Sequence, residues 1–162
     1  MDAVATRTDP VPAPLEAARQ QQHPNCFVCA PENPFGLKLA FSRTDKNRVE
    51  ATFPCGWFYQ GFPGKVHGGI VSALLDGAMV HALMAEGIEA VTADLQVRFI
   101  LPVELGLEAR VIGENRLRKG TIHHLTASVE QGGQARATAR ARFFETRKAS
   151  EPRTRTHHGY QL

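Results

Sequence analysis

The feature that most limits how this chain can fold is an apolar run from Ile70 to Ala85, near the middle of its 162 residues. The run is 16 residues long and contains Asp76 and His81, so it is too short and too polar to span a bilayer. It is apolar on nearly every side, and a helix of this kind outside a membrane has to be covered by other structure. We therefore expect one long buried helix that the rest of the chain wraps.

The segments on either side of this run change to a period of two, which is typical of half-buried strands. Before it, Leu37–Phe41 and Val49–Phe53 suggest a hairpin around the polar turn Thr44–Asn47. After it, further alternating segments lie at Ala93–Phe99, Leu107–Val111, Leu125–Val129 and Ala135–Phe143, with the turn signal Gly132-Gly133 between the last two. The pattern predicts an α+β fold, in which an antiparallel β-sheet of five to six strands wraps around one long central helix.

The length and composition fit a single globular domain, with 43% hydrophobic and 22% charged residues. We expect a flexible N-terminal arm at residues 1–24, a folded domain at 25–145 and a flexible basic tail at 146–162. Much of the formal net charge of +3 falls in that tail, and it is too small and unpatterned to indicate a nucleic-acid partner. We expect neither nucleic acid nor a membrane as a partner.

The cysteines indicate a reducing compartment. Their number is odd and the N-terminus carries no export signal, so a disulfide framework is not expected and a cytoplasmic location is. His23, Cys26 and Cys29 have the residue types of a zinc site, but one Cys-x-x-Cys pair without a local fourth ligand is a weak signal. We expect reduced thiols with no metal and no cofactor, and whether Cys26 and Cys29 bind a metal stays open.

Asp76 is the first candidate for chemistry, because a carboxylate in an apolar helix costs free energy unless it is paired or functional. Ser72, one turn earlier, is a possible partner. His67-Gly68-Gly69 opens the same helix, where free backbone N–H groups and the positive end of the helix dipole gather. Such a helix start can hold the oxyanion of a tetrahedral intermediate, although the glycines could also serve only the turn.

The spacing of these residues has a consequence for assembly. Nine residues of helix rise about 13 Å and make about two and a half turns, so His67 and Asp76 of one chain cannot hold one small group together. If both act on one substrate, they come most simply from two chains. This predicts a homodimer with sites at the subunit interface, and a homotetramer built from two such dimers stays possible.

The segment from Gly64 to Met79, Gly-Lys-Val-His-Gly-Gly-Ile-Val-Ser-Ala-Leu-Leu-Asp-Gly-Ala-Met, resembles the signature of the hotdog-fold acyl-CoA thioesterases, in the branch typified by phenylacetyl-CoA thioesterases. Cys26–Leu37 resembles the lead-in of many bacterial members, and the resemblance covers roughly residues 25–145. It implies hydrolysis of an acyl-CoA thioester to a free acid and CoA. Asp76 would be the nucleophile or general base, the N–H of Gly68 or Gly69 would polarise the carbonyl, and His67 would orient the substrate.

The resemblance extends to Thr92, sixteen positions after Asp76, which matches a hydroxyl residue that positions the attacking water. The alternation of its strand, however, puts Thr92 on the polar side. Gly61 stands where some relatives carry asparagine, and Gln60 before it could substitute.

Other residues are candidates for substrate binding. Arg118 and Lys119, in a segment expected between two strands, could meet the phosphates of CoA, or could belong to a solvated turn. The aromatic residues before the helix could line an acyl pocket or simply pack; they are Trp57, Phe58 and Phe62. The alternatives to a thioesterase are a non-catalytic acyl-CoA-binding protein and an acyl-thioester dehydratase or hydratase. The acyl group itself is not indicated.

Overall fold

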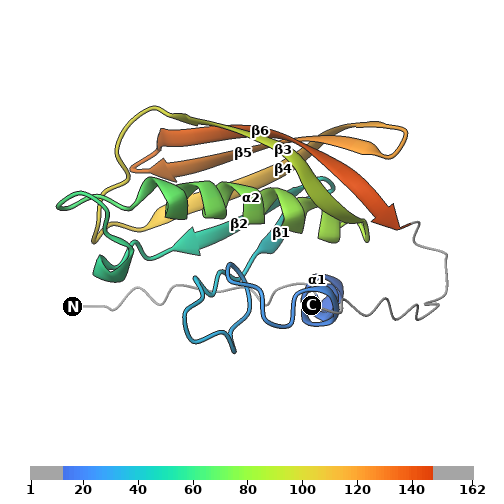
Figure 1. Ribbon diagram of the computed structural model, residues 1–162, viewed down its shortest axis with the longest axis horizontal. Helices are drawn as coiled ribbons and strands as arrows, with labels where there is room; N and C mark the ends of the chain where they lie inside the picture. Colours follow the sequence, from blue (N-terminus) through green and yellow to red (C-terminus); the bar gives the residue numbers. More distant parts are fainter. Residues whose placement is uncertain (1–12, 148–162) are drawn as a thin grey trace, which may run out of the picture.

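The computed structural model describes residues 13–147. In chain order the elements are helix α1 (Ala13–Gln22), strands β1 (Ser42–Asp45) and β2 (Arg48–Phe53), the short 3-10 helix η1 (Trp57–Tyr59), helix α2 (Gly68–Met84), and strands β3 (Glu89–Phe99), β4 (Ala109–Lys119), β5 (Ile122–Gln131) and β6 (Gln134–Arg147). The strands form one antiparallel sheet in the order β1-β2-β4-β5-β6-β3. Figure 1 shows α2 lying along the concave side of this sheet. The predicted fold, an antiparallel sheet around one long helix, is confirmed.

Helix α2 is buried because its apolar residues face structure on most sides. Leu74, Leu75 and Met79 have no exposed surface, and the sheet meets them with alternate residues of its strands, such as Val111 and Phe143. Each fully buried side chain of this size contributes roughly 2 kcal/mol through the hydrophobic effect. Within residues 13–147, no helix is both long and apolar enough to cross a membrane.

The backbone of α2 touches the backbone of β4 at Gly113. A Cβ atom at this position would lie 2.1 Å from the carbonyl oxygen of Ala78, so only glycine allows the contact. On another side of the helix, a Cβ at Gly77 would lie 2.5 Å from Cγ1 of Val28, in the segment that leads from α1 to β1. Helix α2 is therefore held between the sheet and this lead-in segment at one turn.

The expected first strand is displaced. The predicted hairpin is present, but its first strand is Ser42–Asp45 and its turn is only Lys46-Asn47. The residues predicted to form that strand, Leu37–Phe41, pair with Phe27 and Val28 instead. The N–H groups of Leu37 and Leu39 donate hydrogen bonds to the carbonyls of these two residues. Alternation placed their side chains in the core correctly, but it cannot tell which backbone they pair with.

Residues 13–22 of the expected N-terminal arm contact the folded domain. They form α1, in which Leu15 is 3% exposed and joins the core, because its apolar face packs on α2. At the other end β6 continues to Arg147, so the tail expected from residue 146 begins inside a strand. Residues 1–12 and 148–162 lie outside the described part of the chain, and the domain boundaries at 25 and 145 stay predictions.

The contact at Gly113 gives a stability prediction. Gly113→Ala should lower the free energy of unfolding by about 2–4 kcal/mol, because the new methyl group has to push two backbones apart. Urea denaturation would measure this. Gly56→Ala is the matched control, since a Cβ there meets only Tyr59 at an ordinary 3.8 Å and should change stability little. Equal stability of the two variants would contradict the packing described here.

Candidate active site

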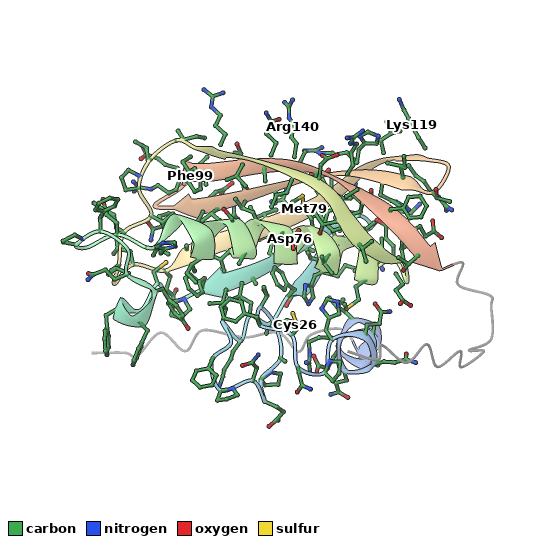
Figure 2. All side chains as sticks on the ribbon, viewed as in Figure 1. Cys26, Asp76, Met79, Phe99, Lys119 and Arg140 are labelled. Carbon is green, nitrogen blue, oxygen red and sulfur yellow. The ribbon has the colours of Figure 1, made fainter. Side chains whose placement is uncertain are left out.

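Asp76 lies half-buried in the middle of α2, and its partner is Thr92 of β3. The Thr92 hydroxyl donates a hydrogen bond of 2.8 Å to Oδ1 of Asp76. Ser72, the partner considered from spacing, instead donates to the carbonyl of Gly68 at 3.0 Å. Figure 2 shows Asp76 on the central helix, between the sheet and the lead-in segment. The structure thus joins two of the candidate residues directly.

The sequence pattern placed Thr92 on the wrong face of its strand. The pairing of β3 with β6 shifts between Thr92 and Asp94, which leaves Ala93 as an extra residue. Such a bulge reverses the side-chain parity on either side of it. Thr92 therefore pairs with the buried Phe143 and faces α2, whereas simple alternation from Leu95 would have turned it outward.

Burial raises the pKa of Asp76 above its ordinary value, and the hydrogen bond from Thr92 acts in the opposite direction. A carboxylate whose pKa is raised holds a proton more strongly, and its ionised form is a better base. Thr92 keeps one oxygen of the carboxylate oriented while the other has no hydrogen-bond partner within residues 13–147. This arrangement suits a general base or a nucleophile.

His67 is the N-cap of α2, and its ring accepts a hydrogen bond from one of the two backbone N–H groups that were expected to stabilise an oxyanion. Nδ1 of His67 accepts a hydrogen bond of 2.9 Å from the N–H of Gly69. The N–H of Gly68 makes no hydrogen bond in the described part of the chain. Gly68, and not Gly69, therefore has a backbone N–H that is free to bind an oxyanion. Because Nδ1 is an acceptor, the neutral His67 ring carries its hydrogen on Nε2, where it can face a ligand.

The loop before α2 explains why residue 61 is glycine. The carbonyl of Tyr59 accepts a 2.7 Å hydrogen bond from the N–H of His67, which folds the loop back on the helix start. A Cβ at Gly61 would lie 3.0 Å from Cα of His67, so an asparagine side chain there would press on His67. Gln60 is engaged within the loop, where its Oε1 accepts from the N–H of Gly64 at 3.1 Å.

Phe99 is a neighbour of the site that the sequence did not single out. Its ring lies 3.5 Å from the position that a Cβ of Gly68 would take, although it comes from the far end of β3. Phe99 is 57% exposed, so it covers only part of the helix start. Alternation predicted that Phe99 faces the helix. Its contact with Gly68 could not be predicted, because it depends on how far β3 runs along α2.

The structure does not bring all candidates together within one chain. His67 and Asp76 are separated by two and a half turns of α2, or about 13 Å along its axis. Arg118 and Lys119 lie beyond the other end of α2, because Asn115 of β4 already bonds Glu86 after that helix ends. Figure 2 shows Lys119 and Phe99 toward opposite ends of the sheet.

The segment that carries Arg118 and Lys119 was expected between two strands, and that is wrong. Both residues belong to β4, and the turn is confined to Gly120-Thr121. Arg118 is already engaged, with Nη2 at 3.0 Å from the Glu145 carboxylate and Nε donating to the Gly120 carbonyl. Charge-rich segments resemble turns in sequence, and the exposed end of β4, which pairs with β5 but lies beyond β2, is charged in the same way.

The aromatic candidates are strongly exposed, with Trp57 at 71%, Phe58 at 77% and Phe62 at 83%. Trp57 and Phe58 stack with ring centroids 3.9 Å apart. One chain therefore supplies at most one wall of an acyl pocket from these residues.

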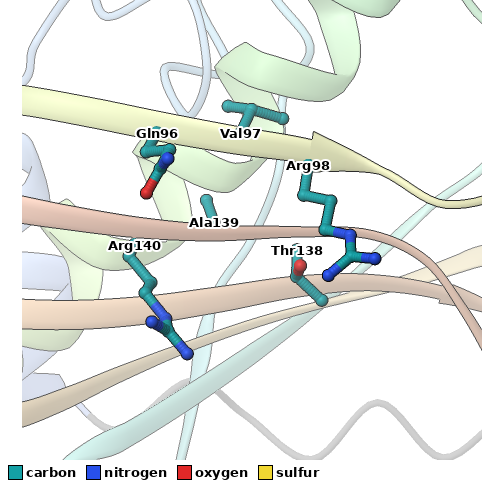
Figure 3. Close-up of a pocket in the computed structure, with 6 residues that line it drawn as sticks. All are labelled: Gln96, Val97, Arg98, Thr138, Ala139 and Arg140. Carbon is teal, nitrogen blue, oxygen red and sulfur yellow. The ribbon is translucent and has the colours of Figure 1, made fainter.

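A separate pocket of about 430 Å³ lies on the outer face of the sheet, lined by residues of β3 and β6. Figure 3 shows that Gln96, Arg98 and Arg140 point away from α2, whereas Val97 and Ala139 point toward it. This pocket lies across the sheet from Asp76 and does not belong to the candidate site.

The chain is similar to one family profile and to several solved structures. The profile of the family described as "Thioesterase superfamily" matches residues 63–137, which include the start of α2, Asp76 and Thr92. No curated protein sequence matches the chain.

Several solved structures share the fold. A crystal structure described as a thioesterase superfamily protein is 26% identical with a TM-score of 0.69; the match covers 72% of this chain but only 61% of that one. A Streptococcus mutans protein bound to acetyl-CoA is 21% identical with a TM-score of 0.63, over 67% of this chain and 88% of that one. The E. coli PaaI protein of the phenylacetic acid degradation operon is 17% identical with a TM-score of 0.63, over 67% and 80%.

The raised pKa of Asp76 predicts how stability depends on pH. Because folding raises this pKa, the ionised carboxylate costs stability above the folded-state pKa, and the cost vanishes as pH falls and the group takes up a proton. Asp76→Asn, which keeps an acceptor for Thr92, should raise Tm at pH 7 by on the order of 2 °C, with the gain disappearing in acid. Thermal melts at several pH values would measure it.

Asp94→Asn is the matched control, because that carboxylate is exposed on the outer face and paired with Arg142. It should give no gain at pH 7. An Asp76→Asn variant less stable than the native protein at pH 7 would contradict the assigned cause.

Proposed function

We propose that the chain is a member of the thioesterase superfamily, whose profile matches residues 63–137, and that on its hotdog fold it hydrolyses an acyl-CoA thioester to a free acid and CoA. The observation that carries the proposal is the half-buried Asp76, oriented by Thr92 on a helix whose first turn offers the free N–H of Gly68. We also place the protein in the branch of the phenylacetyl-CoA thioesterases. Its three free cysteines fit the cytoplasm, where CoA esters are used.

In the proposed reaction Asp76 acts on the thioester carbonyl in one of two ways. As a general base, it takes a proton from water while the water oxygen attacks the carbonyl carbon; the C–S bond then breaks and the CoA thiolate takes up a proton. As a nucleophile, its carboxylate oxygen attacks directly, expels the CoA thiolate and forms an anhydride that water hydrolyses. In both routes the N–H of Gly68 stabilises the oxyanion, and His67 orients the substrate.

Coenzyme A is the proposed carrier of the acyl group, a choice supported by the acetyl-CoA bound to the similarly folded Streptococcus mutans protein. Its phosphates need cationic donors, and we propose Lys119 with Arg118 for that role. Lys119 has no salt bridge among the described residues, whereas Arg118 has to share its guanidinium with Glu145. Trp57, Phe58 and Phe62 are proposed as one wall of the acyl pocket, beside Gln60 and Gly61.

The complete site is proposed to form between two copies of the chain. The length of α2 between His67 and Asp76 is one reason. The other is β3, which ends the sheet and leaves Leu95 36% and Phe99 57% exposed beside α2. An exposed apolar edge strand favours pairing with another chain. A second β3 would bring the Asp76 of one subunit toward the His67 of the other. Two such dimers could join as a tetramer.

The catalytic role of Asp76 is tested by free thiol release from a panel of aromatic, short-chain and medium-chain acyl-CoAs. Asp76→Asn should lower kcat by about 10²–10⁴-fold with little change in fold, because the amide cannot accept the proton. Binding of acyl-CoA without turnover in the native protein would favour a non-catalytic binder. Formation or loss of a double bond without thiol release would favour a dehydratase or hydratase.

Thr92 is tested through the pH dependence of kcat/KM. Its hydrogen bond lowers the pKa of Asp76, so Thr92→Val should move the acidic limb of the profile to higher pH and reduce activity about tenfold at neutral pH. Thr92→Ser keeps the hydroxyl and serves as the control. A valine variant with an unmoved acidic limb would show that Thr92 does not act through Asp76.

The shared site is tested by mixing two inactive variants, His67→Ala and Asp76→Asn. In a mixed dimer one site carries both defects and the other carries none. Random exchange of subunits should therefore restore about a quarter of the native activity. A mixture that stays inactive, although mass spectrometry detects mixed dimers, would mean that each chain holds its own site.

A further inference from the structure

Three side chains of metal-ligating types converge in the segment between α1 and β1, on the side of α2 that faces away from the sheet. The ligand atoms of His23, Cys26 and Cys29 all lie within 4.8 Å of one another. Sγ of Cys29 is 3.8 Å from Nδ1 of His23. In a tetrahedral zinc site, Zn–S bonds of about 2.3 Å and Zn–N bonds of about 2.0 Å put sulfur and nitrogen donors roughly 3.6 Å apart. The cluster therefore already has nearly the spacing that zinc requires.

The backbone of this segment supports the arrangement. Two successive turns, closed by hydrogen bonds from Cys26 N–H to the His23 carbonyl and from Ala30 N–H to the Cys26 carbonyl, direct residues three apart to the same side. The N–H of Val28 lies 3.4 Å from Sγ of Cys26 and donates to it. Backbone donors to sulfur stabilise a thiolate, which is the form that binds metal.

His81 of α2 supplies an independent observation. Its side chain is 2% exposed, and its Nδ1 lies 2.7 Å from the carbonyl of Gly77. Nδ1 therefore carries the hydrogen of the neutral ring, and Nε2 is left as an acceptor with no hydrogen-bond partner within residues 13–147. Buried polar atoms are rarely left unpaired, so each such atom calls for an explanation. Metal-bound histidines commonly have this geometry, with the second nitrogen donating to a backbone carbonyl.

His81 also lies next to the cluster, on the side of His23. Its ring centroid is 6.0 Å from that of His23, and both His81 and Cys29 line one small cavity of about 90 Å³. Phe41 stacks on His81 with a centroid distance of 4.3 Å and limits the ring to this side. Figure 2 shows Cys26 beneath α2, on the opposite side from Lys119 and Arg140.

We propose that His23, Cys26 and Cys29 bind one Zn²⁺ ion, with Nε2 of His81 as the fourth ligand. Two sulfur and two nitrogen ligands in a tetrahedron suit zinc. On binding, both thiol protons pass to solvent, and the two thiolates balance the charge of the ion. Four protein ligands leave no open position, so the role of the ion is structural. It ties the lead-in segment to α2, close to the contact of Val28 with Gly77, and it does not depend on the proposed hydrolysis.

The test uses the full chain, reduced, freed of metal and titrated with Co²⁺, whose visible spectrum reports tetrahedral thiolate ligation. We expect saturation near one Co²⁺ per chain, a thiolate charge-transfer band, and displacement by Zn²⁺. Cys26→Ser and Cys29→Ser should lose that band. Cys55→Ser is the matched control and should keep it, because Cys55 is buried elsewhere, against Phe53 and Gln131. His81→Gln should weaken Zn²⁺ binding by at least about tenfold.

A thermal melt covers the case in which a serine variant does not fold. Removing metal from the native protein with a chelator should lower its Tm by at least about 4 °C, and Zn²⁺ should restore it. The proposal is overturned if the native chain gives no charge-transfer band and no zinc-dependent Tm, or if Cys26 and Cys29 form a disulfide in its place. Unchanged Zn²⁺ affinity in His81→Gln would remove His81 from the site.

Discussion

The contact between α2 and the sheet at Gly113 is the constraint on which the other features depend. Where the two backbones touch, the helix cannot slide or rotate without a clash with the Ala78 carbonyl. This fixes the position of Asp76 along the helix axis relative to β3, so that the Thr92 hydroxyl can donate to its carboxylate. It also fixes the position of Gly68 next to the Phe99 ring. Hydrophobic burial holds the helix in the sheet, but the glycine determines its position.

Helix α2 serves different purposes on its different sides. One side packs on the sheet and supplies the core. A second carries Asp76 toward the free edge at β3, where a half-buried carboxylate keeps both a partner and access. A third meets the lead-in segment through Gly77 and His81. Because these sides belong to one rigid element, a metal ion at His81 and an acid at Asp76 would act on the same helix without sharing a ligand.

Much of the fold could be predicted because burial imposes a period. The all-round apolar run predicted α2, and alternation predicted four strands after it and their inward faces. The predicted strand faces and pairings failed where the pairing of strands departs from regular alternation. The bulge at Ala93 turned Thr92 inward, and Leu37–Phe41 paired with the lead-in rather than with the sheet. A charged strand end was taken for a turn, because charged residues are also common in exposed loops.

The sequence by itself determined the elements and the order of the candidate residues along α2, since each depends on neighbours close in the chain. Only the tertiary structure decided which of them meet. It joined Thr92 to Asp76, left Gly68 with the free N–H, and set Arg118 and Lys119 at the far end of the helix. It also brought His81 beside His23, from a position more than fifty residues further along the chain. Contacts between distant segments arise from packing, which no local pattern records.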